Sequence, residues 1–269
     1  MNARIETAVL ERQEPVMSES ENLRLEISQG KMTQIDLMRH VQNLESMGEL
    51  RAASNLYAMW INHANAPDKH YALFNYGGLL QTQGRFDDAV VAYESCMALK
   101  EDFPQAYINL GLLHEKQGRH TQALNTWLLL VSRRYLKTPP ADEFLVMALN
   151  HVGRLQENLK NYAQAEEALE QSLLIDPKQP GVIQHWVHIR QKSCKWPVYK
   201  PLPGISLAEM RRYTSPLAML ALTEDPAEQL ATAQSFVTRT YTHKQERLCP
   251  SAPYQHPRIR VGYVSADLR

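Results

Sequence analysis

Two stretches of the chain repeat one another: residues 75–93 are NYGGLLQTQGRFDDAVVAY, and residues 109–127 are NLGLLHEKQGRHTQALNTW. They superimpose at one constant offset of 34 positions, since 111 − 77 = 34. The matched pairs are Gly77 with Gly111, Gly84 with Gly118, Ala89 with Ala123, and Tyr93 with Trp127. Coincidence at one offset over several independent positions indicates an internal structural repeat.

The period and the residue types resemble the tetratricopeptide repeat, a unit of two antiparallel helices. The small residues at the matched glycine and alanine positions let the two helix backbones approach closely, and the aromatic residue fills the space beyond. The second glycine of each pair falls between the helices, where a positive φ costs glycine little. We therefore assign structural roles to Gly77, Ala89, Tyr93, Gly111, Ala123 and Trp127.

Weaker units flank the two clear ones. A third unit carries Gly153, Ala165 and Leu169 and ends at Asp176-Pro177; its glycine follows Gly111 by 42 positions (153 − 111). The eight extra residues fit in 132–143, SRRYLKTPPADE, where Pro139-Pro140 forbids continuous helix. An earlier unit has Val41 at the glycine position, so we expect an atypical cap there; its other template positions are Leu37, Leu44, Gly48, Ala53, Tyr57 and Trp60. Ile183 and Trp186 continue the phase of a first helix after Pro177.

We predict an all-α fold, a right-handed tetratricopeptide-repeat superhelix with a helical linker and one terminal β-strand. An N-terminal tail occupies 1–30, and about three to four repeats plus a terminal helix occupy 31–195. A helical, Pro-rich linker follows over 196–257. Residues 258–269 contain IRVGYVSADLR, whose alternating apolar residues and polar end are typical of the first strand of an α/β domain.

The composition excludes several classes of binding partner. Lys and Arg (29) balance Asp and Glu (29), so no net field favours nucleic acid or an anionic membrane. No apolar run is long enough to span a bilayer, and the N-terminus lacks the apolar core of a secretory signal. Three widely spaced cysteines do not make a disulfide framework. These features predict a soluble, cytoplasmic protein that binds neither nucleic acid nor a membrane.

Four ordered motifs carry a more specific resemblance. CKW at 194–196, YTSPL at 213–217, EDPAEQL at 224–230 and RIRVGYVSADLR at 258–269 are similar to bacterial proteins of the SPINDLY and O-linked N-acetylglucosamine transferase family. The likeness covers about 71–269. It implies the recognition portion of an inverting protein O-glycosyltransferase, in which the final strand opens the first of two Rossmann-like lobes that hold a UDP- or GDP-sugar.

The same resemblance implies that the donor-binding residues would follow Arg269. By itself the chain is then expected to be inactive, with no catalytic residue and no cofactor, and to meet a nucleotide-sugar only where the missing domain is present. Two alternatives remain open. The chain is a standalone tetratricopeptide scaffold that bridges protein partners, or it is the folded remnant of a premature stop.

The resemblance also implies a peptide-binding site. Family members carry asparagines on the concave face of the superhelix that bind the backbone of an extended substrate, and the matching positions here are Asn75 and Asn109. An amide both donates and accepts, so it can bind a peptide backbone whatever its sequence. Arg39 and His151 stand at the matching positions of the flanking units, which limits the row to two amides. The alternative is that these amides stabilise a turn or face solvent.

His185, His188 and Cys194 invite a zinc interpretation, because three ligand types lie close in sequence. Cys194 is six positions beyond His188, however, and no second cysteine is near. We therefore predict no metal site, a packed or exposed histidine pair, and a buried apolar role for Cys194. Phosphate-loop, hydrolase and metalloprotease motifs do not occur in the sequence.

Overall fold

The computed structural model describes residues 19–63, 66, 68–132 and 141–241. Over these ranges the chain forms thirteen α-helices, and its only β-pairing is one isolated bridge between Leu202 and Ile205. The helices are α1 (Glu19–Ser28), α2 (Gln34–Ser46), α3 (Leu50–His63), α4 (Lys69–Thr82), α5 (Phe86–Leu99), α6 (Pro104–Lys116), α7 (His120–Ser132), α8 (Ala141–Asn158), α9 (Tyr162–Ile175), α10 (Pro180–Lys192), α11 (Leu207–Tyr213), α12 (Pro216–Leu220) and α13 (Pro226–Thr240). The predicted all-α repeat fold is confirmed. The predicted strand at 258–269 and the insertion at 133–140 lie outside the described residues.

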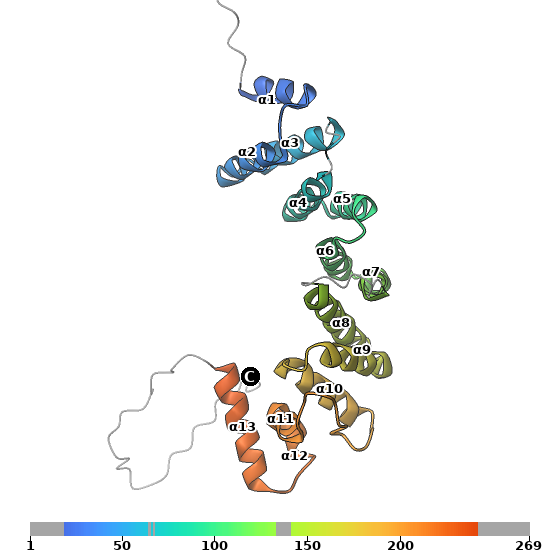
Figure 1. The fold of residues 1–269 in the computed structure, drawn as a ribbon. Coiled ribbons are helices and arrows are strands. Elements are labelled where there is room, and N and C mark those ends of the chain that lie inside the picture. The colour runs from blue at the N-terminus through green and yellow to red at the C-terminus, as the bar shows by residue number, and fades with distance from the viewer. Residues whose placement is uncertain (1–18, 64–65, 67, 133–140, 242–269) are drawn as a thin grey trace, which may run out of the picture. The chain divides into compact units, whose positions relative to one another are not determined.

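The helices form two compact units, divided between Thr214 and Ser215. In the first unit, α2 with α3, α4 with α5, α6 with α7, and α8 with α9 pack as consecutive hairpins, and each hairpin contacts the next (Figure 1). α10 packs on α9, and α11 packs on α10. This unit therefore includes residues 196–214, which we had assigned to the linker.

Each hairpin closes where a glycine of its first helix meets a large side chain of its second. A Cβ added to Gly77 would lie 2.8 Å from the Tyr93 ring, and one added to Gly111 would lie 2.1 Å from Trp127 Nε1. The hairpin of α8 and α9 repeats the contact, between Gly153 and Leu169. Ala89, Ala123 and Ala165 are fully buried beside these contacts. Only a residue without a side chain allows this approach, so the periodic glycines determine how tightly each pair of helices packs.

The turns within the hairpins share one backbone conformation. Gly84 and Gly118 have φ of +75° and +73°, and the residue after each glycine donates its N–H to the carbonyl five positions back, at 2.9 Å in both turns. The same conformation is taken by Lys160 (φ 63°) and by Cys194 (φ 52°), although neither is glycine. Cys194 is exposed. Our prediction that Cys194 is buried is wrong, because its position at the end of α10 turns its side chain away from the core.

The first hairpin ends the row of repeats at its N-terminal side. Val41 occupies the glycine position and is buried, in one apolar cluster with Tyr57. Ile27 of α1 is buried in the same cluster, and Trp60 Nε1 donates to the Met32 carbonyl at 3.0 Å. Part of the predicted tail over 1–30 therefore packs as a helix on the first hairpin.

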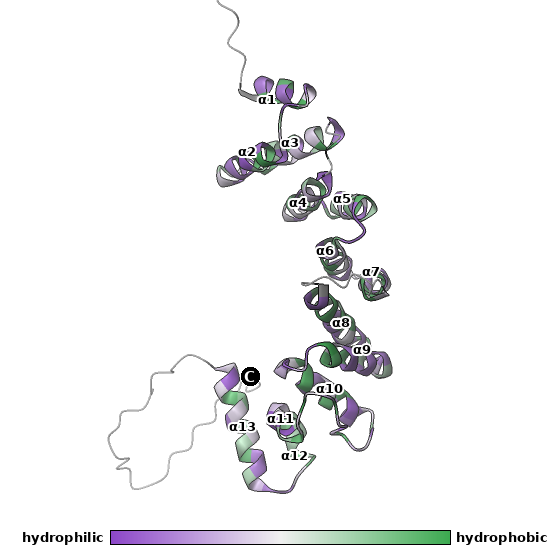
Figure 2. Cartoon of the chain, in the orientation of Figure 1, coloured by the Kyte–Doolittle hydropathy of each residue, from purple (hydrophilic) through white to green (hydrophobic). Residues whose placement is uncertain are grey.

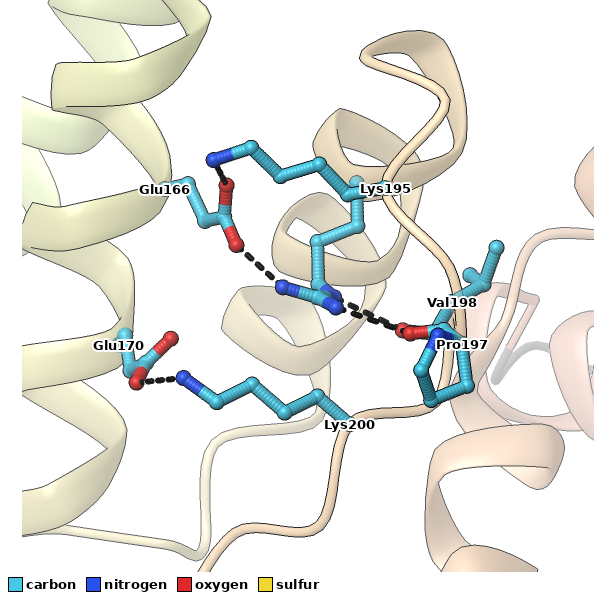
Figure 3. Close-up of polar contacts among 7 residues, drawn as sticks. Glu166, Glu170, Lys195, Pro197, Val198 and Lys200 are labelled. Carbon is cyan, nitrogen blue, oxygen red and sulfur yellow. Dashed lines mark hydrogen bonds and ion pairs between the residues drawn. The ribbon is translucent and has the colours of Figure 1, made fainter.

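At the other end of the first unit, the segment after α10 is held by buried charge. Arg190 pairs with Glu166 of α9 and donates to the carbonyls of Pro197 (2.8 Å) and Val198 (3.0 Å). Lys195 Nζ lies 2.5 Å from the same Glu166 carboxylate (Figure 3). The guanidinium thus connects the acidic side chain of α9 to the extended segment that follows α10.

The second unit contains α12 and α13 in its described part. Ser215 and Asp225 cap these helices by accepting from the N–H groups of Ala218 and Ala227, and a proline occupies the first position of each helix. Within the described ranges no helix is both long and apolar enough to cross a membrane. Hydrophilic and hydrophobic residues share the helices throughout (Figure 2).

Candidate functional site

Asn75 and Asn109 occupy equivalent places on the first helices of neighbouring hairpins, α4 and α6. Both side chains are half-buried. The Asn75 amide hydrogen-bonds the Tyr57 hydroxyl of the preceding hairpin, and the Asn109 amide likewise hydrogen-bonds the Tyr93 hydroxyl. The structure therefore places each predicted amide against a buried aromatic residue rather than free in solvent.

The tyrosine hydroxyls stay protonated over the physiological range. Burial raises the pKa of Tyr57 to about 12, helped by the charge of Glu45, and burial also raises the pKa of Tyr93. The asparagine contact opposes the rise in pKa in both cases, which is the effect of an amide that directs an N–H at the hydroxyl oxygen. The amide carbonyl oxygen and the second N–H of each asparagine are then left for another ligand.

The residues at helical spacing from these amides form one surface, which we call the amide face. From Asn75 and Asn109, steps of three, six and seven residues along α4 and α6 return to the same side of each helix. The amide face consists of Asn75, Gly78, Gln81, Thr82, Asn109, Leu112 and Lys116. With Tyr93, all of these except Asn75 line an open hollow of about 370 Å³. Gly78 adds no side chain to the hollow, so space remains for a ligand backbone.

Two polar groups of the hollow are fixed by contacts within the protein. The Tyr93 hydroxyl donates to Gln81 Oε1 at 3.4 Å, and the Thr82 hydroxyl donates to the Gly78 carbonyl at 3.1 Å. The Gln81 amide N–H groups and the second N–H of Asn109 therefore act as the donors of the hollow. The sequence missed Gln81, Thr82 and Lys116. Their spacing from the two asparagines is the signal that could have identified them.

The row of amides ends at α8. His151, at the position that matches Asn75 and Asn109, stacks on Trp127 with ring centroids 5.0 Å apart and planes 18° apart. His185 occupies the same position one repeat later, on α10. Its Nδ1 lies 2.9 Å from a carboxylate oxygen of Glu157. At the other end, Arg39 is exposed and pairs with Asp36 at 3.0 Å. Only α4 and α6 present asparagine amides at this position of the repeat.

Protonation of His151 makes the stability of the fold depend on pH. Burial, followed by the charge of Arg154, holds the pKa of His151 below its ordinary value, while Glu115 opposes this shift. The unfolded chain consequently binds this proton more readily than the folded one. The stability that neutral His151 contributes is complete above the ordinary histidine pKa and is lost as the pH falls through the folded pKa.

The three potential zinc ligands do not converge. His185 faces Glu157, and Cys194 lies in the turn after α10. Burial and the charge of Lys192 lower the pKa of His188. In the parts of the chain that the structure describes, no cluster of three or more His, Cys, Asp or Glu side chains could hold a metal ion.

Two family models match the chain. A model described as "TPR repeat" matches 79–118, and a model described as "Tetratricopeptide repeat" matches 148–179. The chain contains tetratricopeptide repeats. The first match covers the end of α4 and all of α5 and α6, and hence most of the residues that line the hollow beside Asn109.

The chain is also similar to one curated protein and to several solved structures. The Hsp70-Hsp90 organising protein of Plasmodium falciparum is 29% identical over 114 residues, which span 42% of this chain and 42% of that protein. A crystal structure of MamA matches 82% of this chain and 98% of its own at 13% identity, with a TM-score of 0.51. PilF of Pseudomonas aeruginosa matches 82% of this chain and 95% of its own at 17% identity, with a TM-score of 0.46.

The likeness to MamA supports the fold alone. None of these matches extends the likeness to a glycosyltransferase. The transferase interpretation therefore stays a prediction that rests on the four sequence motifs.

Proposed function

We propose that the chain is a protein-interaction scaffold whose amide face binds an extended peptide segment of a partner protein. The observation that carries the proposal is the pair of half-buried asparagines, each anchored to a tyrosine hydroxyl by one N–H and each keeping a donor and an acceptor for a ligand. An extended peptide offers the matching N–H and carbonyl groups along its backbone.

Anchoring favours binding. A side chain already held by the Tyr57 or Tyr93 hydroxyl loses less rotamer freedom when a ligand arrives than a free surface amide does. The hollow beside Asn109 gives the peptide room to lie close to α4 and α6. Two further facts support a scaffold: the repeat fold itself, and the similarity to a protein named as an organiser of Hsp70 and Hsp90.

The test begins with a random library of linear 12-residue peptides selected on the immobilised full chain. Affinities of the selected peptides are then measured by fluorescence polarisation. Each net hydrogen bond contributes about 1 kcal/mol, so we expect Asn75→Ala and Asn109→Ala each to weaken binding about fivefold and the double variant about 30-fold.

The matched control is Asn125→Ala, which removes an exposed amide from α7, away from the amide face. It should leave affinity unchanged. All variants should keep the helical circular dichroism of the wild type. Selected peptides that bind the double variant as tightly as the wild type would overturn the proposal.

A further inference from the structure

Lys116 is a cation of the amide face that pairs with no carboxylate among the described residues. It is exposed, lines the hollow, and its Nζ lies 4.9 Å from the centroid of the Phe86 ring. Among the described residues, no carboxylate lies within ion-pair distance of Lys116, and a ring contact leaves its N–H groups free to bind an anion.

Three acidic residues on α5 and α6 are already paired with arginines. Asp88 pairs with Arg85 at 2.7 Å, and Asp87 pairs with Arg119 at 2.9 Å. Glu115, the immediate neighbour of Lys116, pairs with Arg154 of α8 at 2.5 Å. These three carboxylates are thus paired, whereas no carboxylate of the described residues pairs with the Lys116 ammonium group.

The remaining polar groups of the hollow favour the same kind of ligand. Gln81 accepts from the Tyr93 hydroxyl and so presents its N–H groups, and Asn109 presents its second N–H. The hydroxyl proton of Thr82 is used within α4. Besides the Asn109 carbonyl oxygen, which can accept from a peptide N–H, the hollow offers several donors and one positive charge. The group that complements this charge is an acceptor with negative charge.

Asn109 and Lys116 are seven residues apart on α6, which places them on one face about 10 Å apart along the axis. The lysine side chain leans toward the N-terminus of its helix and shortens that gap. An extended peptide advances about 3.3 Å per residue. A carboxylate within about three residues of the peptide unit bound by Asn109 can therefore reach Lys116.

Building on the proposed function, we propose that the bound segment carries an Asp or Glu whose carboxylate pairs with Lys116. The occupant of the hollow is then an acidic extended segment rather than any exposed strand or loop. The two amides supply sequence-independent affinity, and Lys116 supplies a preference for one side chain.

Lys192 offers a matched control from the same chain. It follows Lys116 by 76 positions (192 − 116), the same separation as Tyr162 from Phe86, and its Nζ lies 5.7 Å from the Tyr162 ring. Like Lys116 at the end of α6, Lys192 is the last residue of its helix, α10. α10 does not carry either of the two asparagines.

The experiment uses the same random 12-residue library and the full chain. Aligned peptides selected on the wild type should show Asp or Glu enriched at one fixed position. Selection on Lys116→Glu should replace this preference by Lys or Arg. For one selected acidic peptide, Lys116→Gln should weaken binding about two- to fivefold and should not further weaken binding of the matching Asp→Asn or Glu→Gln peptide. Lys192→Gln should change neither.

The outcomes separate the two proposals. Binding that needs Asn75 and Asn109 but shows no acidic preference, or that falls equally with Lys192→Gln, overturns the role of Lys116 and leaves the proposed function standing. A chain on which no peptide is selected, or whose peptides ignore both amides, contradicts both proposals.

Discussion

Replacing Gly111 by alanine tests how the hairpins pack. The added Cβ would lie 2.1 Å from Trp127 Nε1 and 2.4 Å from Cε2, more than 1 Å inside ordinary van der Waals contact. The indole cannot easily move, because Trp127 is fully buried, stacks on His151 and donates to the Ile108 carbonyl at 3.4 Å. Overpacking at such a site costs about 3 kcal/mol.

The same substitution gains about 1 kcal/mol of helix propensity, because alanine replaces glycine inside α6. The expected net loss is therefore about 2 kcal/mol in the free energy of unfolding, measured by urea denaturation followed by circular dichroism. Gly78→Ala is the matched control in the neighbouring hairpin, since its Cβ would meet only Tyr93 Oη at 3.8 Å. That variant should gain about 0.5–1 kcal/mol. A Gly111→Ala chain as stable as the wild type, or a Gly78→Ala chain that loses as much, would refute the packing argument.

Three other changes follow from the structure, each measured by the same denaturation. Arg190→Met should cost about 3–5 kcal/mol, because it removes the buried partner of Glu166 and leaves this carboxylate only the half-exposed Lys195. Lys195→Met should cost about 1 kcal/mol or less, because that side chain is half exposed; equal losses would contradict the assignment. Lys160→Gly should gain about 0.5 kcal/mol by removing a side chain from a left-handed backbone conformation, and a loss would count against it. The free energy of unfolding should fall as the pH is lowered below the ordinary histidine pKa, and His151→Gln should flatten this dependence; an unchanged slope would contradict the direction assigned to the pKa of His151.

Much of the fold could be predicted because its packing depends on residue types that recur at a fixed spacing. Gly77 and Gly111 lie against Tyr93 and Trp127. Because few other residues fit this contact, glycine recurs at the same position of these repeats and can be recognised in the sequence. The turn conformation is different. Gly84 and Gly118 reveal it, but Lys160 takes the same conformation with no residue type to mark it.

The contacts that the sequence did not reveal depend on single pairs far apart along the chain. Arg190 and Glu166 belong to different helices and do not recur in other hairpins, so no period indicates them. In the candidate site, too, only the features that recur with the repeat could be predicted. The repeat aligned Asn75 with Asn109, whereas the tyrosine partners of the amides and the unpaired charge of Lys116 emerged only from the packing of neighbouring hairpins.

The most direct test of the central claim, that the two amides bind a partner's backbone, is an NMR titration of the 30.8 kDa chain with a selected peptide. The side-chain amide resonances of Asn75 and Asn109 should shift in proportion to the bound fraction. Those of Asn150 should stay in place, because its amide donates to Gln179 at 2.7 Å and accepts from Ser172 of α9 at 2.7 Å. A peptide that binds while the resonances of Asn75 and Asn109 remain unchanged would contradict the account.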